Sequence, residues 1–277
     1  MSESWAEHAG QAEIPLAGGD VTEGVVRVGD TVRRPVGPHS PLVHALLTHL
    51  ESAGFEGAPR FLGIDGSGRE VLTYIDGEVA GRPRPPWIAD ETRLASVGQL
   101  VRAYDDAAAS FAPAPDALPG TRAPEPPGIP PAPAYPPELI GHVDITPENV
   151  VFRHGGAYAL IDFDLAKPAT QADEMFNAML WWAPLSDPRD VDPLLRHADA
   201  ARRAQTHGGG WQLDPGRRGP QELVSRGHRA APGPLRPVRE SSLAQGRWAE
   251  SPAWMASLPQ LASRCSASAE RDPGSAS

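Results

Sequence analysis

The fold is decided by one stretch of the chain, Gly141-His-Val-Asp-Ile-Thr-Pro-Glu-Asn-Val-Val-Phe-Arg-His-Gly-Gly-Ala-Tyr-Ala-Leu-Ile-Asp-Phe-Asp-Leu-Ala166. Residues 150–152 and 158–161 are short apolar runs of the kind found in β-strands. The His-Gly-Gly sequence at 154–156 lies between them and is typical of a tight turn. We therefore expect a two-stranded hairpin here.

Three polar residues flank this hairpin: Asp144, Asn149 and Asp162. Because a hairpin returns its second strand to the start of the first, Asp162 should lie close to Asn149, with Asp144 in the preceding loop. Carboxylate and amide oxygens are hard ligands that suit Mg²⁺. Phosphoryl transfer uses one carboxylate to orient the attacking hydroxyl and accept its proton, and a carboxylate with an amide to hold the metal. We predict that Asp144 is catalytic and that Asn149 and Asp162 bind the metal.

The spacing of these residues matches the kinase catalytic loop. His142-x-Asp144-x4-Asn149 follows its pattern, and Asp162 stands where protein kinases place a metal-binding aspartate. The alternative is that Asp144 and Asn149 are only turn or cap residues. Asp162 is harder to explain in that way, because it follows an apolar run and a buried, unpaired carboxylate is unfavourable. We expect His142 to support the loop through hydrogen bonds.

The segments at 142–152 and 160–166 resemble the aminoglycoside phosphotransferase family of kinase-like enzymes. Asp164 occupies a position where protein kinases carry glycine, which favours this family. The resemblance covers residues 14–190 and implies a two-lobed α+β fold, with an antiparallel N-terminal sheet and a mainly helical C-terminal lobe. It also implies ATP or GTP as donor, Mg²⁺ as cofactor, and as partner a small-molecule hydroxyl acceptor that is aminoglycoside-like or another metabolite.

Residues 14–78 are expected to form the nucleotide-binding lobe. Short strand patterns separated by glycine-rich turns run through residues 14–34. By the resemblance, Gly18 and Gly19 would bring backbone N–H groups close to the nucleotide phosphates. A Gly-Gly pair taken alone is more often only a turn.

The third strand of a kinase carries a lysine for the nucleotide phosphates, but the one lysine of this chain is Lys167. We predict that Arg33 takes that position, with Arg34 as the alternative, because a guanidinium binds phosphate oxygens in pairs. The other interpretation is an exposed edge-strand arginine. The helix expected between Ser40 and Gly54 offers His44 where kinases place the glutamate that pairs with this cation.

Two further strands are expected at 61–64 and 69–75, on either side of a turn. By the resemblance, Thr73, Tyr74 and Ile75 would form the hinge between the lobes and bind the nucleotide base through their backbone. The alternative is an ordinary strand end.

Residues 79–204 are expected to form the second lobe. Apolar spacing predicts a helix over 90–111, and an apolar helix is expected over 173–185. Asp173 resembles an acidic residue of the family, but a helix-cap role is favoured. The eleven prolines in residues 113–137 predict a loop.

The two ends of the chain differ from the rest in composition. Residues 1–13 are expected to be a flexible tail. Residues 205–277 are rich in Gly, Pro, Ser and Arg and show no sustained helical pattern. We interpret them as an atypical segment, either aberrant or frame-shifted in origin or disordered.

The composition excludes several classes of function. A formal charge of −10 over 277 residues argues against nucleic acid or an acidic membrane as partner. The single Cys265 excludes an internal disulfide, and no apolar run is long enough for a membrane span. The chain begins without a signal-peptide pattern, so a cytoplasmic location is expected. The sequence does not predict the oligomeric state.

The leading interpretation is a small-molecule kinase. The first alternative is a nucleotide-binding relative without catalytic activity, suggested by the missing strand lysine, the missing helix glutamate and the atypical C-terminus. The second is a metal-dependent hydrolase, which is disfavoured because such sites usually need more His or Asp ligands.

Overall fold

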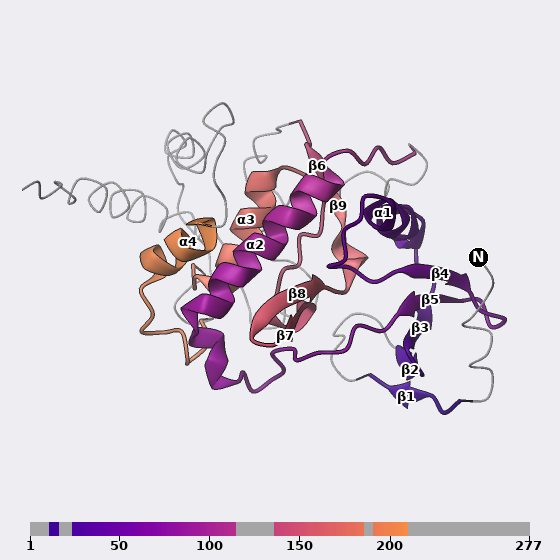
Figure 1. The fold of residues 1–277 in the computed structure, drawn as a ribbon, viewed down its shortest axis with the longest axis horizontal. Helices are drawn as coiled ribbons and strands as arrows, with labels where there is room; N and C mark the ends of the chain where they lie inside the picture. The colour runs from indigo at the N-terminus through magenta and orange to yellow at the C-terminus, as the bar shows by residue number, and fades with distance from the viewer. Residues whose placement is uncertain (1–10, 17–23, 115–135, 186–190, 210–277) are drawn as a thin grey trace, which may run out of the picture.

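The computed structural model describes residues 11–16, 24–114, 136–185 and 191–209, and these residues form two lobes (Figure 1). The N-terminal lobe is a sheet with one helix, and the C-terminal lobe is mainly helical. The predicted two-lobed α+β architecture is confirmed. Within the described ranges no helix is long and apolar enough to cross a membrane.

The N-terminal sheet is antiparallel and has five strands in the order β1-β2-β3-β5-β4. Its strands are β1 (Ile14–Pro15), β2 (Val26–Val28), β3 (Thr31–Pro35), β4 (Phe61–Ile64) and β5 (Arg69–Thr73). The register places Arg34 of β3 directly opposite Glu70 of β5. Opposite charges in this position stabilise a strand pair.

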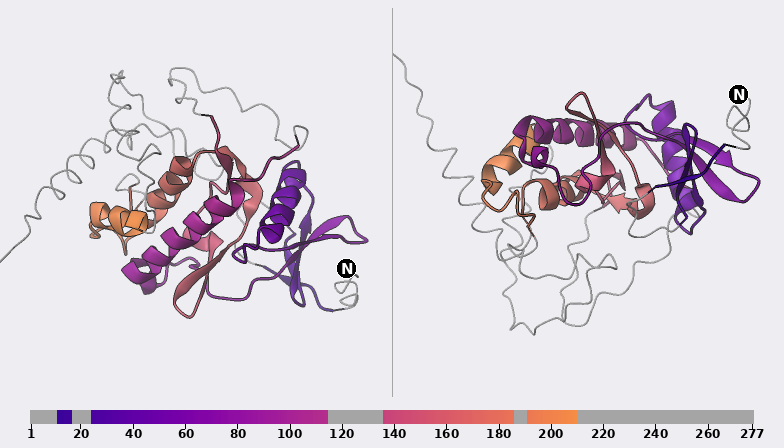
Figure 2. Two further views of the ribbon diagram at one scale, coloured as in Figure 1. Left: turned by 45° about the horizontal axis from the view of Figure 1, so that its top comes forward. Right: turned by 90° about the horizontal axis from the view of Figure 1, so that it is seen from below.

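Helix α1 (Ser40–Ser52) lies between this sheet and the C-terminal lobe (Figure 2). Its leucines are buried in the core, and the helix stops before Gly54, whose φ of +76° suits glycine. His39 is the N-cap residue and makes no side-chain capping bond, while the Ser40 hydroxyl accepts a hydrogen bond from Gly37 N–H.

The C-terminal lobe is built on helix α2 (Glu91–Ala108), which agrees with the predicted helix apart from a shorter C-terminal end. Asp90 caps it by accepting hydrogen bonds from Thr92 and Arg93 N–H. The other elements described in this lobe are two helices, two strand pairs and three 3-10 turns. They are α3 (Gln171–Trp182), α4 (Ala200–Gly209), the hairpin β7 (Val150–Arg153) and β8 (Gly156–Leu160), the pair β6 (Leu139–Gly141) and β9 (Lys167–Ala169), and the turns η2 (Pro86–Ala89), η4 (Pro147–Asn149) and η5 (Phe163–Leu165). The predicted hairpin therefore forms, and its turn has positive φ at both His154 (52°) and Gly155 (83°).

Helix α4 crosses the boundary expected at residues 204–205. Arg203 and His207 are both buried, and α4 packs closely on α2 at Gly98, where a Cβ atom would lie 2.2 Å from the His207 carbonyl oxygen. The described part of the lobe thus continues to Gly209. The rest of the C-terminal segment, residues 1–10 and most of the proline-rich loop lie outside the described residues.

Candidate active site

The loop of residues 142–146, which carries the predicted catalytic residue Asp144, joins β6 to η4 and is held by two side chains of α3. Asn177 accepts a hydrogen bond from Ile145 N–H (2.7 Å) and donates to the Val143 carbonyl (2.9 Å). Glu174 Oε1 accepts a hydrogen bond from Val143 N–H at 2.8 Å. Val143 has a φ of 51°, which is unfavourable for a β-branched residue, so these bonds from α3 maintain the bend that presents Asp144.

His142 is buried behind this loop and supports it through hydrogen bonds of both ring nitrogens. Its Nδ1 accepts a hydrogen bond from Asp144 N–H at 3.3 Å, so Nε2 carries the ring hydrogen and donates to the Ile161 carbonyl at 3.0 Å. Burial lowers the pKa of His142 to about 4, and the ring is therefore neutral at physiological pH. This geometry supports the structural role expected for His142.

Asp144 and Asn149 are in direct contact. The amide nitrogen of Asn149 donates to Asp144 Oδ2 at 2.8 Å and to the Asp144 carbonyl at 3.0 Å. These two bonds use Asp144 Oδ2 and the Asp144 carbonyl as acceptors. In the part of the chain that the structure describes, neither Asp144 Oδ1 nor Asn149 Oδ1 accepts a hydrogen bond. One carboxylate oxygen is thus left for an acceptor hydroxyl, and one amide oxygen for a cation.

Asp162 follows β8 and adopts a left-handed conformation with φ 64° and ψ 70°. The backbone bond from Ile161 N–H to the Asn149 carbonyl (2.9 Å) places Asp162 beside the start of β7, as the hairpin predicted. Its side chain is 38% exposed, so it lies at the surface of the site.

The carboxylates of the site raise one another's pKa. Burial, followed by the charge of Asp162, raises the pKa of Asp144 to about 6. Burial, followed by the charge of Asp164, raises the pKa of Asp162. A bound cation would relieve this repulsion, so the donor set fits Mg²⁺. Among the described residues no group of three or more His, Cys, Asp or Glu is placed to hold a metal, so Asn149 and Asp162 would need phosphate oxygens or water to complete the coordination.

The cation nearest to this site is Arg34 and not Arg33. Arg34 Nη1 lies 3.2 Å from Asp162 Oδ1, and Arg34 Nη2 lies 2.5 Å from Asp164 Oδ1. Arg33 contacts Asp65 in the turn after β4, with Arg33 Nη1 3.4 Å from Asp65 Oδ2. The two arginines diverge because successive side chains of a strand point to opposite faces of the sheet. The structure therefore places Arg34, the alternative candidate, beside Asp162, and places Arg33 beside Asp65 instead.

Glu70 on β5 is the carboxylate that pairs with Arg34 across the sheet. It is fully buried, and it bonds Arg34 through Oε1 and His44 through Oε2. Burial acts to raise the pKa of Glu70, but the His44 bond and the Arg34 charge bring it below its ordinary value. His44, expected where kinases place the partner of the strand cation, bonds Glu70, and Glu70 itself was not predicted. The available sign of this contact was the position of Glu70 directly opposite Arg34 in the β3–β5 strand pair.

The expected hinge lies where the chain leaves the sheet. Thr73 N–H donates to the Arg60 carbonyl (3.0 Å), and Tyr74 N–H donates to the Asp30 carbonyl (2.7 Å). Two of the three predicted backbone donors are therefore engaged within the lobe. Within the described ranges Ile75 N–H makes no backbone hydrogen bond. Gly18 and Gly19 lie outside the described residues.

Glu174 and Asn177 were also missed by the sequence reasoning, which treated α3 as an apolar helix. Their spacing of three residues on one helix face was the available signal. Asp173 is instead part of a capping box with Thr170, in agreement with the favoured helix-cap role.

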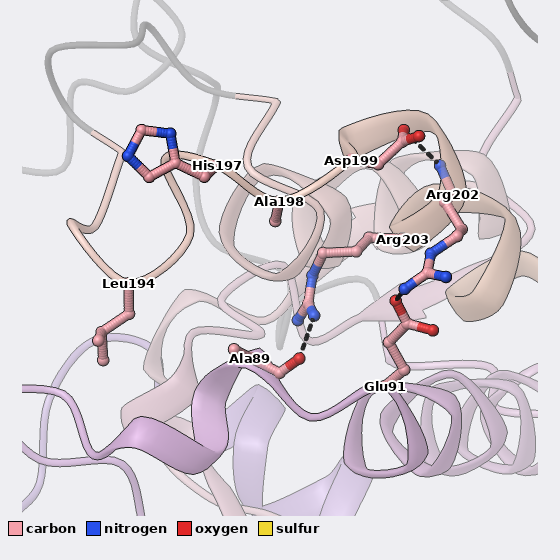
Figure 3. A pocket seen from close by; sticks show the side chains of 8 residues that line it. All are labelled: Ala89, Glu91, Leu194, His197, Ala198, Asp199, Arg202 and Arg203. Atoms are coloured by element: carbon pink, nitrogen blue, oxygen red, sulfur yellow. Dashed lines mark hydrogen bonds and ion pairs between the residues drawn. The ribbon is translucent and has the colours of Figure 1, made fainter.

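A cavity of about 590 Å³ lies away from the catalytic loop, between the start of α2 and the segment before α4 (Figure 3). Its Arg203 donates hydrogen bonds to the carbonyls of Trp182, Ala89 and Ile88, and its Arg202 pairs with Glu91. These arginines join α4 to the lobe. None of the predicted site residues lines this cavity.

Comparisons with known proteins give both sequence and structural relatives. No family model matches the chain. The trifolitoxin immunity protein of Rhizobium leguminosarum bv. trifolii is 37% identical over 181 residues, which span 63% of this chain and 64% of that protein. The alignment thus covers less than two thirds of the relative's length.

Three solved structures align with the chain at low sequence identity. The GDP complex of aminoglycoside 2'-phosphotransferase-IIIa has a TM-score of 0.46 and 14% identity, covering 94% of this chain and 93% of that one. Aminoglycoside-3'-phosphotransferase of type VIII has a TM-score of 0.45 and 17% identity, covering 73% of this chain and 87% of that one. Macrolide 2'-phosphotransferase from Brachybacterium faecium has a TM-score of 0.42 and 15% identity, covering 76% of this chain and 82% of that one. The chemistry of the site is therefore inferred from the contacts of its own side chains.

Proposed function

We propose that the chain is a small-molecule kinase that transfers the terminal phosphate of ATP or GTP to a hydroxyl group. One observation carries the proposal: Asn149 bonds Asp144 from within the kinase-like catalytic loop, and a backbone hydrogen bond joins Asn149 to the residue before Asp162. This arrangement matches the division of roles in phosphoryl transfer between a residue that takes the proton and a pair that holds the metal.

Asp144 would orient the acceptor hydroxyl through Oδ1. As the hydroxyl oxygen bonds to the terminal phosphorus, its proton passes to Asp144 and the bond from that phosphorus to the nucleoside diphosphate breaks. A pKa of about 6 leaves Asp144 ionised at neutral pH and close to the working pH of a general base.

Asn149 and Asp162 would hold Mg²⁺, which neutralises phosphate charge when it is bound. Arg34 is the cation of the N-terminal lobe that lies at this site, and we propose that it steadies the phosphates. Glu70 and His44 fix the guanidinium in place. Catalysis would then rest on positioning and on charge complementarity.

For the acceptor we propose a class of compound, small molecules that carry a hydroxyl group. The sequence relative is named as a trifolitoxin immunity protein. A toxin that carries a hydroxyl group is therefore a candidate acceptor beside aminoglycosides and small metabolites.

The test is nucleotide turnover with Mg²⁺ over a panel of these acceptors, with wild type beside Asp144→Ala. Acceptor-dependent release of ADP or GDP, lost in the variant, would support the proposal and identify the acceptor class. Nucleotide binding without turnover on any acceptor would favour a non-catalytic relative instead.

A further inference from the structure

Three carboxylates converge on the guanidinium of Arg34, and each contacts a different nitrogen. Glu70 bonds Nε, Asp162 Oδ1 lies 3.2 Å from Nη1, and Asp164 Oδ1 lies 2.5 Å from Nη2. Glu70 belongs to β5 of the N-terminal lobe, whereas the two aspartates lie at η5 in the C-terminal lobe. The proposed kinase chemistry gives a role to Glu70 and to Asp162, but none to Asp164.

The three carboxylates differ in how open they are to a ligand. Glu70 is fully buried and the Asp164 side chain is 10% exposed, but the Asp162 side chain is 38% exposed. His39, the residue before α1, adds a further contact on Asp164, with Nε2 3.2 Å from Oδ1. Nε and Nη2 of Arg34 thus meet the two less exposed carboxylates, and Nη1 meets the one that a ligand can reach.

The shape of the guanidinium makes these contacts interdependent. Its three nitrogens lie in one plane at fixed angles, so two anchored nitrogens determine where the third one points. The partners also maintain the charge, because burial acts to lower the pKa of Arg34 while the charges of its carboxylate partners, Asp164 first, raise it above the ordinary value. Contacts at Nε and Nη2 therefore fix the direction of Nη1.

We propose that Asp164 is a positioning residue for Arg34. Together with Glu70 it holds the guanidinium, so that Nη1 exchanges Asp162 for a phosphate oxygen of the nucleotide while the contacts at Nε and Nη2 persist. Asp162 gives up Nη1 most readily, because it is the most exposed of the three partners and is the carboxylate proposed to bind Mg²⁺. This role rests on the proposed kinase function, whereas the contact between Arg34 and Asp164 does not.

Two substitutions of Asp164 separate positioning from charge. Asp164→Asn and Asp164→Ala both remove a negative charge near the phosphates, but only the asparagine keeps an oxygen that accepts a bond from Nη2. Calorimetric titration of ATP and GTP with Mg²⁺ onto the full-length chain should show about tenfold weaker binding to Asp164→Ala than to Asp164→Asn, as expected for the loss of one bond to a charged group. Equal dissociation constants for the two variants would overturn the proposal. Asp106→Asn removes an exposed carboxylate of α2 and should match wild type.

The same comparison without the cation identifies the residue through which Asp164 acts. Arg34→Gln combined with Glu70→Gln removes the guanidinium and its buried partner together, so no buried charge is left behind. In this background Asp164→Asn and Asp164→Ala should bind nucleotide equally. A tenfold difference that persists would mean that Asp164 acts on the metal or the nucleotide itself, and would overturn the positioning role.

Urea unfolding tests the contact in the absence of nucleotide, and applies also if the background binds none. Asp164→Ala should lower the unfolding midpoint more in wild type than in the Arg34→Gln, Glu70→Gln background, because its bond to Nη2 exists only in wild type. Equal shifts in the two would overturn the contact. A contact that served stability alone would change the midpoints and leave the two Asp164 variants with equal dissociation constants, which overturns the positioning role. Unequal shifts with no nucleotide binding to wild type would support the contact, but overturn the kinase proposal and the phosphate role with it.

Discussion

The amide nitrogen of Asn149 donates a hydrogen bond to Asp144 Oδ2 at 2.8 Å, and so ties a proposed metal-binding residue to the proposed base. The bond favours the ionised form of Asp144 and opposes the effects of burial and of the Asp162 charge. It also fixes the orientation of the carboxylate before any substrate arrives, which is how positioned groups accelerate proton transfer.

Asp144→Asn should therefore lower kcat by about 10²–10⁴-fold, because the amide cannot accept the hydroxyl proton. The affinity for nucleotide should change little, since Asp144 is not among the residues proposed to bind the nucleotide or its metal. Steady-state kinetics together with a nucleotide titration measures both. Asp76→Asn, at an exposed position of the connection between the lobes, is the control and should match wild type. Equal activity in Asp144→Asn and wild type would remove Asp144 from the chemistry.

Arg34→Gln should destabilise the fold much more than Arg33→Gln. Without Arg34 the buried Glu70 keeps His44 as its partner among the described residues, and breaking a buried ion pair costs about 3–5 kcal/mol. Asp65, which contacts Arg33, retains Arg69 at 2.9 Å, so Arg33→Gln leaves no buried carboxylate without a cation and should cost less than Arg34→Gln. Urea unfolding measures both free energies.

A double variant checks the cause of this difference. Adding Glu70→Gln to Arg34→Gln removes the buried charge that was left behind, and should restore part of the lost stability. A larger loss from Arg33→Gln than from Arg34→Gln would contradict the placement of the two arginines.

Gly98→Ala should lower stability by about 1–3 kcal/mol, although alanine favours helices by up to about 1 kcal/mol. The reason is the close contact of α2 with α4, where the new Cβ would lie 2.2 Å from the backbone oxygen of His207. Gly66→Ala is the matched control, because a Cβ there has no atom within 4 Å. Equal melting temperatures for the two variants would argue against the packing of α4 on α2.

Acid should destabilise the fold through His207. Burial lowers its pKa from 6.5 to about 4, so below pH 6.5 the unfolded chain binds a proton that the folded chain does not. Stability from this group is therefore complete above pH 6.5 and falls as the pH drops towards 4, by roughly 3 kcal/mol in total. Urea unfolding at several pH values should show a smaller loss in His207→Gln than in wild type. His197→Gln, at an exposed position of the segment before α4, is the control and should behave as wild type (Figure 3).

The fold and the centre of the site follow from local sequence patterns. The catalytic-loop hairpin is encoded by two apolar runs and a turn that needs positive φ, and these features also fix the neighbouring positions of Asn149 and Asp162. Helices α1 and α2 follow from their apolar spacing.

Residues that act across elements could not be predicted in the same way. The choice of Arg34 over Arg33 depends on which face of β3 meets Asp162, and the contact of Glu70 with Arg34 depends on the register between β3 and β5. Glu174 acts on the catalytic loop through a contact between residues 31 positions apart. Such relationships appear only when the lobes are assembled.

Magnesium-dependent nucleotide binding tests the central claim most directly, because it does not require the acceptor. Calorimetric titration of ATP and GTP, with and without Mg²⁺, should show binding to wild type that Mg²⁺ strengthens. Asp162→Ala should lose the Mg²⁺ dependence, and Asp144→Asn should keep it. No binding of either nucleotide to wild type, or a Mg²⁺ dependence that survives in Asp162→Ala, would contradict the assignment of this loop as a phosphotransferase site.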